Sequence, residues 1–233
     1  MATIGGSNIV TEGLVLSLDA ANRKSYPGSG TTWTDLSTLT TSSLVNGPIF
    51  STDGGGSIAF DRVDDYGRLV RSDLNGGSFA YTNLTCNIWI KPSSTGGTGI
   101  NGNNIITVEN TFEISIGNNS NGFSGINYAS VPWAWYGTTG NVLTNDKWNM
   151  LTFVHATTGR WLYVNGTEVF YRGDTGNLGA GSSTWPYLTL MARYSGNGSL
   201  AKGSLGNVFL YNRALSVSEI IQNYNSQKSR FEL

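Results

Sequence analysis

The sequence predicts an all-β protein: a two-sheet sandwich or jelly roll closed by one short C-terminal helix. Of the 233 residues, 31 are Gly, 12% are aromatic and only 12% are charged, a composition typical of strand-rich globular proteins. Short apolar or alternating runs recur between turn-forming residues along most of the chain, which is the pattern of a β-sandwich. Only one segment has convincing signals for the start of a helix.

The strands follow from alternation and from the turns between them. Residues 1–12 are small and polar and are predicted to form a flexible arm, and residues 13–233 are predicted to form a single domain because no linker or repeat interrupts them. The pair Asn165-Gly166 is the strongest hairpin signal. The predicted strands cover residues 14–18, 44–50, 57–60, 67–70, 84–90, 105–108, 112–116, 123–128, 148–155, 161–164, 167–171, 187–192 and 208–211.

The last predicted strand is apolar on both faces. Val208 and Leu210 fall on one side of an extended chain, and Phe209 and Tyr211 fall on the other. A strand of this kind lies inside a sheet that is covered on both sides.

The helix follows that strand after a tight corner. Ser216 is a suitable N-cap, and Glu219 three residues later completes a capping box. Ile220, Ile221 and Tyr224 then recur at helical spacing and are predicted to share the buried face.

Charge and composition exclude several classes of partner. The net charge is −1 and no basic patch stands out, so we expect no nucleic-acid partner. No run approaches the ~20 apolar residues of a membrane span, and the amino terminus lacks a signal-peptide pattern. The single Cys86 cannot form an internal disulfide, and the single His155 cannot build a histidine metal site alone.

Aromatic residues are the main candidates for binding. Trp133 and Trp135 fall on one face of an extended segment that continues into Tyr136, and Trp185 and Tyr187 bracket a proline. Rigid aromatic faces stack on sugar rings or anchor protein interfaces. The alternative is that Trp133 and Trp135 fill the core, which is also where we expect the remaining tryptophans. These are Trp33, Trp89, Trp148 and Trp161.

Five segments, in a shared order, resemble the concanavalin A-like, laminin-G-type jelly roll in its bacterial and phage branch. The resemblance implies that fold for residues 14 to about 225. The segments are LVLSLDAAN (14–22), SIAFDRVDDY (57–66), LTCNIWIKP (84–92), KWNMLTFVHATTGRWLYVNGTEV (147–169) and GSLGNVFLYNRALSVSEI (203–220).

The resemblance also bears on metal binding. Relatives often have Asp and Glu where this chain has Gly206 and Asn207, and that Asp can contribute to a structural calcium site. Asp64 and Asp65 remain as weak metal candidates. Two carboxylates are too few for the 6–8 oxygen ligands of calcium unless carbonyls and waters supply the rest, so we expect no cofactor, with a structural calcium left open.

Catalysis is not expected. Retaining glycosidases on related jelly rolls carry paired carboxylates about 5–5.5 Å apart, in an E-x-D-x-x-E pattern that this chain lacks. The nearest pair, Glu109 and Glu113, is interrupted by the turn-like Asn110-Thr111 and is predicted to face solvent near a hairpin. The lone His155 is expected to be structural.

The opening segment suggests where the protein acts. Residues 13–37, GLVLSLDAANRKSYPGSGTTWTDLS, resemble openings of structural proteins of tailed phages, especially marine cyanophages. This resemblance implies a virion protein made in the host cytoplasm, beside other capsid or tail proteins, and either a homo-oligomer or present in many copies per particle. A capsid decoration or head-fibre protein, with possible binding of host-surface glycans, is favoured over a tail-fibre tip or adaptor. A bacterial polysaccharide-binding module or glycoside hydrolase is the alternative of another class.

Overall fold

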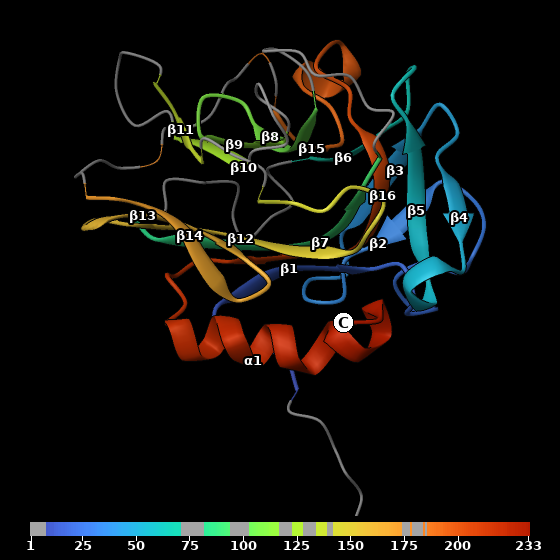
Figure 1. The fold of residues 1–233 in the computed structure, drawn as a ribbon. Helices are drawn as coiled ribbons and strands as arrows, with labels where there is room; N and C mark the ends of the chain where they lie inside the picture. The colour runs from blue at the N-terminus through green and yellow to red at the C-terminus, as the bar shows by residue number, and fades with distance from the viewer. Residues whose placement is uncertain are drawn as a thin grey trace, which may run out of the picture.

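In the computed structural model, the chain folds into two eight-stranded antiparallel sheets with one helix outside them (Figure 1). This confirms the predicted all-β jelly-roll sandwich with a single short C-terminal helix. The structure describes residues 8–70, 82–93, 103–116, 123–127, 134–138, 142–173, 178, 184 and 186–233.

Sheet A carries the closing strand of the domain in its interior. The long β16 pairs with β7 on one side and with both β5 and β1 on the other. The order is β14 (Thr167–Arg172), β13 (Gly159–Val164), β12 (Asn149–Ala156), β7 (Leu84–Pro92), β16 (Lys202–Tyr211), β5 (Ser57–Asp61) and β4 (Ile49–Ser51), with β1 (Leu14–Asp19) beside β16.

Sheet B lies opposite sheet A (Figure 1). Its order is β11 (Ala134–Gly137), β10 (Phe123–Asn127), β9 (Phe112–Ile116), β8 (Asn104–Val108), β15 (Tyr187–Leu190), β6 (Tyr66–Val70), β3 (Thr41–Val45) and β2 (Thr32–Thr34). The remaining elements are the 3-10 turns η1 (Asp53–Gly55), η3 (Tyr194–Gly196) and η4 (Lys228–Phe231), and the helix α1 (Val217–Gln227).

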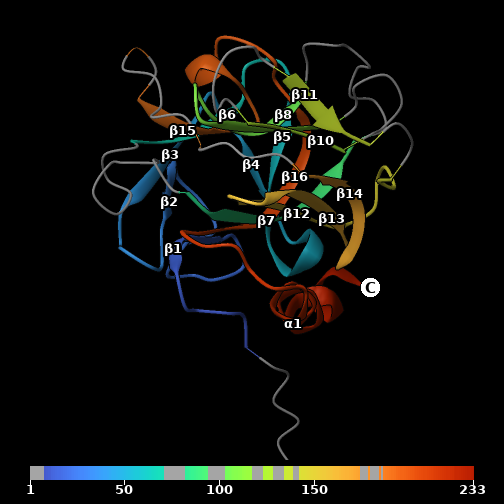
Figure 2. The same cartoon turned by 90° about the vertical axis from the view of Figure 1, so that its left-hand side faces the viewer.

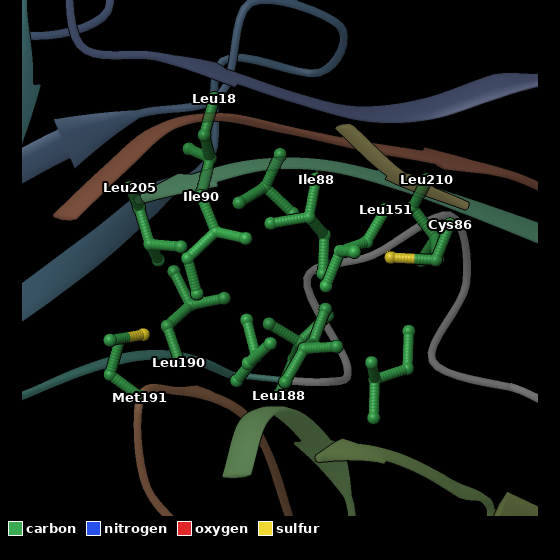
Figure 3. Packing of buried hydrophobic residues seen from close by; sticks show 14 of the residues in the cluster. Leu18, Cys86, Ile88, Ile90, Leu151, Leu188, Leu190, Met191, Leu205 and Leu210 are labelled. Carbon is green, nitrogen blue, oxygen red and sulfur yellow. The ribbon is translucent and has the colours of Figure 1, made fainter. Parts of the chain in front are cut away.

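The main core fills the space between the two sheets. Figure 3 shows Ile88 and Ile90 of β7 pointing towards Leu188 and Leu190 of β15, which lies in the other sheet. All four side chains are buried, and each contributes roughly 1.5–3 kcal/mol by leaving water.

A second apolar cluster covers the outer face of sheet A. Phe209 and Tyr211 of β16 belong to this cluster, whereas Val208 and Leu210 belong to the main core. The prediction of a strand covered on both sides is therefore confirmed. Figure 2 shows the cover: α1, seen nearly along its axis, lies beneath sheet A.

The helix begins as predicted, but its buried face differs. Ser216 and Glu219 form the predicted capping box. Ile220 is buried, but Ile221 is 42% exposed, and Asn223 is buried in its place. The polar Asn223 can be buried there because its amide nitrogen donates hydrogen bonds to Asn87 and to the hydroxyl of Tyr211, at 2.9 and 3.0 Å.

The predicted strand over residues 44–50 is in fact two strands in different sheets. β3 ends at Val45 in sheet B, and β4 begins at Ile49 in sheet A. Asn46 and Gly47 have φ of 65° and 102°, so the chain turns at these two residues and passes from sheet B to sheet A. The sequence also missed the short strands β2 and β11.

The predicted flexible arm is held in place from residue 8 onward. Val10 is buried; its N–H donates to Asn223 Oδ1 at 2.8 Å, and its carbonyl accepts from the Tyr211 hydroxyl at 3.0 Å. Ile9 packs on the same apolar cluster. These contacts fix Ile9 and Val10 against sheet A and α1; residues 1–7 of the predicted arm lie outside the described residues.

Candidate functional site

The backbone register of sheet B aligns one residue from each of its strands in a single row. Leu69, Leu188, Val108 and Phe112, which are sequence neighbours of row members, all lie in the main core. Because strand residues alternate between faces, the side chains of the row from Thr32 to Glu113 lie on the face turned away from the core. The row reads Thr32, Ser43, Arg68, Thr189, Thr107, Glu113, Ile126 and Trp135.

Exposure divides this outer face into two halves. The open half holds exposed or half-buried side chains, and the closed half holds buried ones together with the partly exposed Arg193. The open half consists of Thr32, Thr34, Thr41, Ser43, Arg68 and Tyr187. The closed half consists of Thr107, Glu109, Glu113, Thr189 and Arg193.

The closed half is an ion-pair cluster. Arg193 Nε lies 3.1 Å from Glu109 Oε1, and Arg193 Nη2 lies 2.8 Å from Glu113 Oε1. Asn104 donates to the second oxygen of Glu113 at 2.6 Å. The prediction that Glu109 and Glu113 face solvent is wrong: both are buried, and one guanidinium, brought in from the segment after β15, forms ion pairs with both.

The segment that carries Arg193 has a constrained shape. Tyr194 and Ser195 have φ of 50° and 56°, and the Arg193 guanidinium lies 4.4 Å from the Tyr194 ring centroid. At Gly196, a Cβ atom would lie 2.3 Å from the Tyr66 ring. Glycine is therefore required for η3 to pack on β6, which holds Arg193 over the two carboxylates. Burial raises the pKa of Tyr194.

The open half is built around Arg68 and Tyr187. The guanidinium carbon of Arg68 lies 5.1 Å from the centroid of the Tyr187 ring. Among the described residues, no carboxylate pairs with Arg68. The hydroxyls of β2 and β3 stand beside this pair, because Ser43 is directly opposite Arg68 and Thr32 is directly opposite Ser43. The arrangement offers one cation, one aromatic face and several groups that both donate and accept.

The structure places the predicted aromatic residues unequally. Tyr187 lies on β15 in the open half, where it contacts Arg68. Trp135 and Tyr136 lie in β11, paired with β10, and nothing is described of their side chains. Trp133 and Trp185 lie outside the described residues.

The other tryptophans have a structural role. Trp33, Trp89 and Trp148 are buried as expected. Trp161 is half-buried and stacks on Tyr171, with ring centroids 5.1 Å apart.

Arg68 was missed by the sequence analysis. Its only signal was the alternation of residues 66–70, in which Leu69 faces inward and Arg68 outward. That pattern does not identify the strand that brings an aromatic ring beside it.

The weak metal candidates Asp64 and Asp65 lie in a turn together with Asp61. Their carboxylate oxygens are within 4.8 Å of one another. Asp65 Oδ2 accepts from the N–H of Asp61 at 3.1 Å, and Asp61 Oδ1 accepts from Val63 at 2.7 Å. Burial, together with the charges of Asp61 and Asp64, raises the pKa of Asp65. These three carboxylates shape the turn and fall short of the ligand number that calcium takes.

Gly206 and Asn207, which stand where relatives often have Asp and Glu, have a packing role in this structure. A Cβ at Gly206 would lie 2.5 Å from the Phe231 ring, so a side chain there would displace η4. Asn207 Nδ2 donates to Gln227 Oε1 of α1. Both residues therefore fit the C-terminal segment against sheet A.

Two hollows of about 210 and 270 Å³ on sheet A share Asp53, Lys91 and Asp146. Each is smaller than the roughly 300–1,000 Å³ typical of ligand pockets. Lys91 Nζ lies 2.8 Å from Asp53 Oδ2, and Trp148 donates to Asp53 Oδ1 at 3.2 Å. These polar groups bind one another, which leaves the open half as the better candidate.

Comparison with known families agrees with this architecture. Residues 61–221 match the concanavalin A-like lectin/glucanases superfamily. The chain belongs to this superfamily. No curated protein matches it significantly.

Several solved structures share the superfamily fold at low sequence identity. Trypanosoma rangeli sialidase with the inhibitor DANA matches at a TM-score of 0.66 and 16% identity, over 99% of this chain and 35% of that one. The ligand-binding domain of botulinum neurotoxin serotype D with N-acetylneuraminic acid matches at 0.67 and 16%, over 92% and 52%. Domain 4 of the Geobacillus stearothermophilus arabinanase AbnA with arabinotriose matches at 0.65 and 14%, over 91% and 98%. This chain thus spans about a third of the length of the sialidase, and the similarity at these identities concerns the fold.

Proposed function

We propose that this chain is a non-catalytic, lectin-like domain that binds a glycan on the open half of sheet B. The observation that carries the proposal is the Arg68–Tyr187 pair, set among exposed hydroxyls on a sheet face that no helix covers in the described part of the chain. An aromatic face with nearby hydrogen-bonding groups suits a sugar ring, which has apolar faces and a polar rim. Membership of a lectin and glucanase superfamily supports this ligand class.

The carboxylates of the closed half argue against glycoside hydrolysis. A retaining or inverting glycosidase needs one carboxyl to donate a proton and another to attack or to activate water. Glu109 and Glu113 are buried and share the guanidinium of Arg193. Their oxygens therefore face a cation of the protein itself, which supports a binding role.

We further propose that the domain is part of a phage virion, as a capsid decoration or head-fibre protein present in many copies. This proposal rests on the resemblance of residues 13–37 to openings of tailed-phage structural proteins. A tail-fibre tip or adaptor is the second candidate, favoured if the bound glycan proves to be the surface receptor of the host.

Glycan binding is tested with an array followed by titration of the best ligand. Tyr187→Ala is expected to weaken binding about tenfold or more, because a stacking surface is lost. Tyr171→Ala is the matched control: Tyr171 is 53% exposed and lies on β14 of sheet A, away from the open half. An array that stays blank, or equal effects of the two substitutions, would overturn the proposal.

The non-catalytic assignment is tested by incubating the protein with laminarin- and agarose-type polysaccharides. We expect no hydrolysis. Hydrolysis by the wild-type chain that disappears in Glu109→Gln or Glu113→Gln would show that the domain is an enzyme.

The virion assignment is tested by mass spectrometry of purified particles. We expect the chain in many copies, retained through a gentle salt wash. Its absence from the particles, or its loss in the wash, would contradict the assignment.

A further inference from the structure

We infer that the glycan bound at the open half carries a carboxylate group, which is held by the guanidinium of Arg68. This inference rests on the proposed function, because it names the class of sugar that the same site takes. It concerns acidic sugars such as uronic or sialic acids, in which a planar carboxylate is attached to the ring.

Arg68 differs from the arginines that hold the fold together. Four other arginines bind groups of the protein itself, and their pairing is expected in a folded domain. Arg193 binds Glu109 and Glu113, Arg213 binds Glu219, Arg230 binds Asp19 together with backbone carbonyls, and Arg23 binds the carbonyl of Pro27. Arg68 has no such carboxylate among the described residues, and its one described side-chain contact is the Tyr187 ring.

The side-chain hydrogen-bond donors of Arg68 have no protein acceptor among the described residues. A guanidinium carries five N–H donors in its plane. The Tyr187 ring lies 5.1 Å from the guanidinium carbon and accepts no conventional hydrogen bond from it. A planar carboxylate can then accept two parallel hydrogen bonds, an arrangement that a neutral sugar hydroxyl cannot reproduce.

Nearby acidic side chains do not neutralise Arg68. Glu113 lies three strands away in the row, which at about 4.8 Å per strand is roughly 14 Å, beyond the screening length in physiological salt. Glu113 is also paired with Arg193. Glu109, directly after β8 and two strands away, is paired with Arg193 as well. No ion pair joins Asp65 to Arg68. Within the described part of the chain, the positive charge of Arg68 is thus available to attract an anion.

The neighbouring hydroxyls suit the rest of a sugar. Ser43 stands directly opposite Arg68, and Thr41 and Thr32 are exposed beside it. Opposed side chains on adjacent strands have Cβ atoms about 4.5–5.5 Å apart, which is close to the width of one sugar ring. One acidic residue over Arg68 and Tyr187 would thus place its ring hydroxyls near β3.

The test compares ligands that differ only in the acid. Galacturonate oligosaccharide is titrated against its methyl ester, and N-acetylneuraminyl-lactose against lactose, by calorimetry with the full chain. We expect at least one acid to bind about 10–100 times more tightly than its neutral partner, because charge-assisted hydrogen bonds are lost in the latter. The preference should shrink as salt is raised.

Variants assign the effect to Arg68. Arg68→Met should abolish the preference for the acid, and Arg68→Lys should restore only a part of it, because lysine keeps the charge but lacks the planar fork. Lys24→Met is the control: it removes the same charge from an exposed loop position and should leave binding unchanged. Thermal unfolding of each variant checks that Arg68, an outward-facing residue, is not needed for folding.

The outcomes separate this inference from the proposed function. Equal binding of the acid and its neutral partner, with loss of both in Tyr187→Ala, would overturn the inference and leave the proposed function standing. No binding of any sugar would overturn both. Full binding by Arg68→Lys, or binding of a sulfated sugar in place of the carboxylated ones, would overturn the assignment of a carboxylate held by two hydrogen bonds from the Arg68 guanidinium.

Discussion

The outer faces of the two sheets differ in what covers them. On sheet A the outward side chains include Trp89, Phe209 and Tyr211, and α1 with η4 buries them. On sheet B the outward residues of the row from Thr32 to Glu113 carry hydroxyls or charges. This chain thus supplies its own cover where both faces of a strand are apolar. The face with polar outward positions is the one that we propose for ligand binding.

Sheet B itself adds a second contrast. In the closed half, buried Glu109 and Glu113 are tolerated because Arg193 compensates them. In the open half, Arg68 has no such counterion among the described residues. Charges that stabilise the fold and a charge proposed for binding thus occupy the same face, and the substitutions Arg193→Met and Arg68→Met can separate their roles.

The largest effect on stability is expected from Phe231→Ala, which removes an aromatic side chain from the apolar cluster on the outer face of sheet A. Phe231 stacks on Trp89 at 4.2 Å and lies 4.8 Å from Trp148, measured between ring centroids. Deleting a buried Phe side chain should lower the free energy of unfolding by about 4 kcal/mol, as measured by urea denaturation. Leu233→Ala, at a residue 46% exposed, is the control and should change it by less than about 0.5 kcal/mol. Equal effects would show that η4 is not part of the cover.

Arg193→Met should come next, because it leaves two buried carboxylates without their cation. We expect the free energy of unfolding to fall by about 3 kcal/mol. This is at the lower end for a broken buried ion pair, because the Arg193 side chain retains 13% exposure. Arg68→Met, which removes the same charge from the open half, should change stability by less than about 0.5 kcal/mol. If the two substitutions had similar effects on urea denaturation, the distinction between the halves would fail.

The smallest effect concerns the cap of the covering helix. Two hydrogen bonds from Arg213, at 3.0 and 2.5 Å, hold the pKa of Glu219 at about 2, with further bonds from Ser216. Because this pKa is lowered on folding, its stabilisation is present above about pH 4.5 and is lost as pH falls towards 2.

Glu219→Gln should therefore lower the free energy of unfolding by about 1 kcal/mol at pH 7, because it weakens the helix cap and removes a partly exposed ion pair. Near pH 2 the decrease should be much smaller. Thermal unfolding at the two pH values measures the difference. A difference between wild type and variant that did not shrink at low pH would contradict the assigned cause.

Much of the fold could be predicted because its signals are local. The capping box of Ser216 and Glu219 involves neighbours in the chain, and the two apolar faces of residues 208–211 follow from simple alternation. The resemblance to the concanavalin A-like jelly roll, drawn for residues 14 to about 225, is confirmed by the family match over residues 61–221. Exposure at the helix surface was less predictable, as Ile221 and Asn223 show, because it depends on the groups that the helix meets.

The candidate site was predicted only in part. Tyr187 was named from its aromatic character, but its partner Arg68 was not, and Glu109 and Glu113 were assigned to solvent. Periodicity tells which way a side chain faces within its own strand but not which strand lies beside it. The amino-acid sequence by itself determined an all-β sandwich with a capped helix and a two-sided closing strand. Only the tertiary structure inserted β15 between β6 and β8. That placement put Tyr187 beside Arg68 and Arg193 beside two carboxylates. The sequence could not predict these pairs, because their members are far apart in the chain and periodicity describes only neighbouring residues.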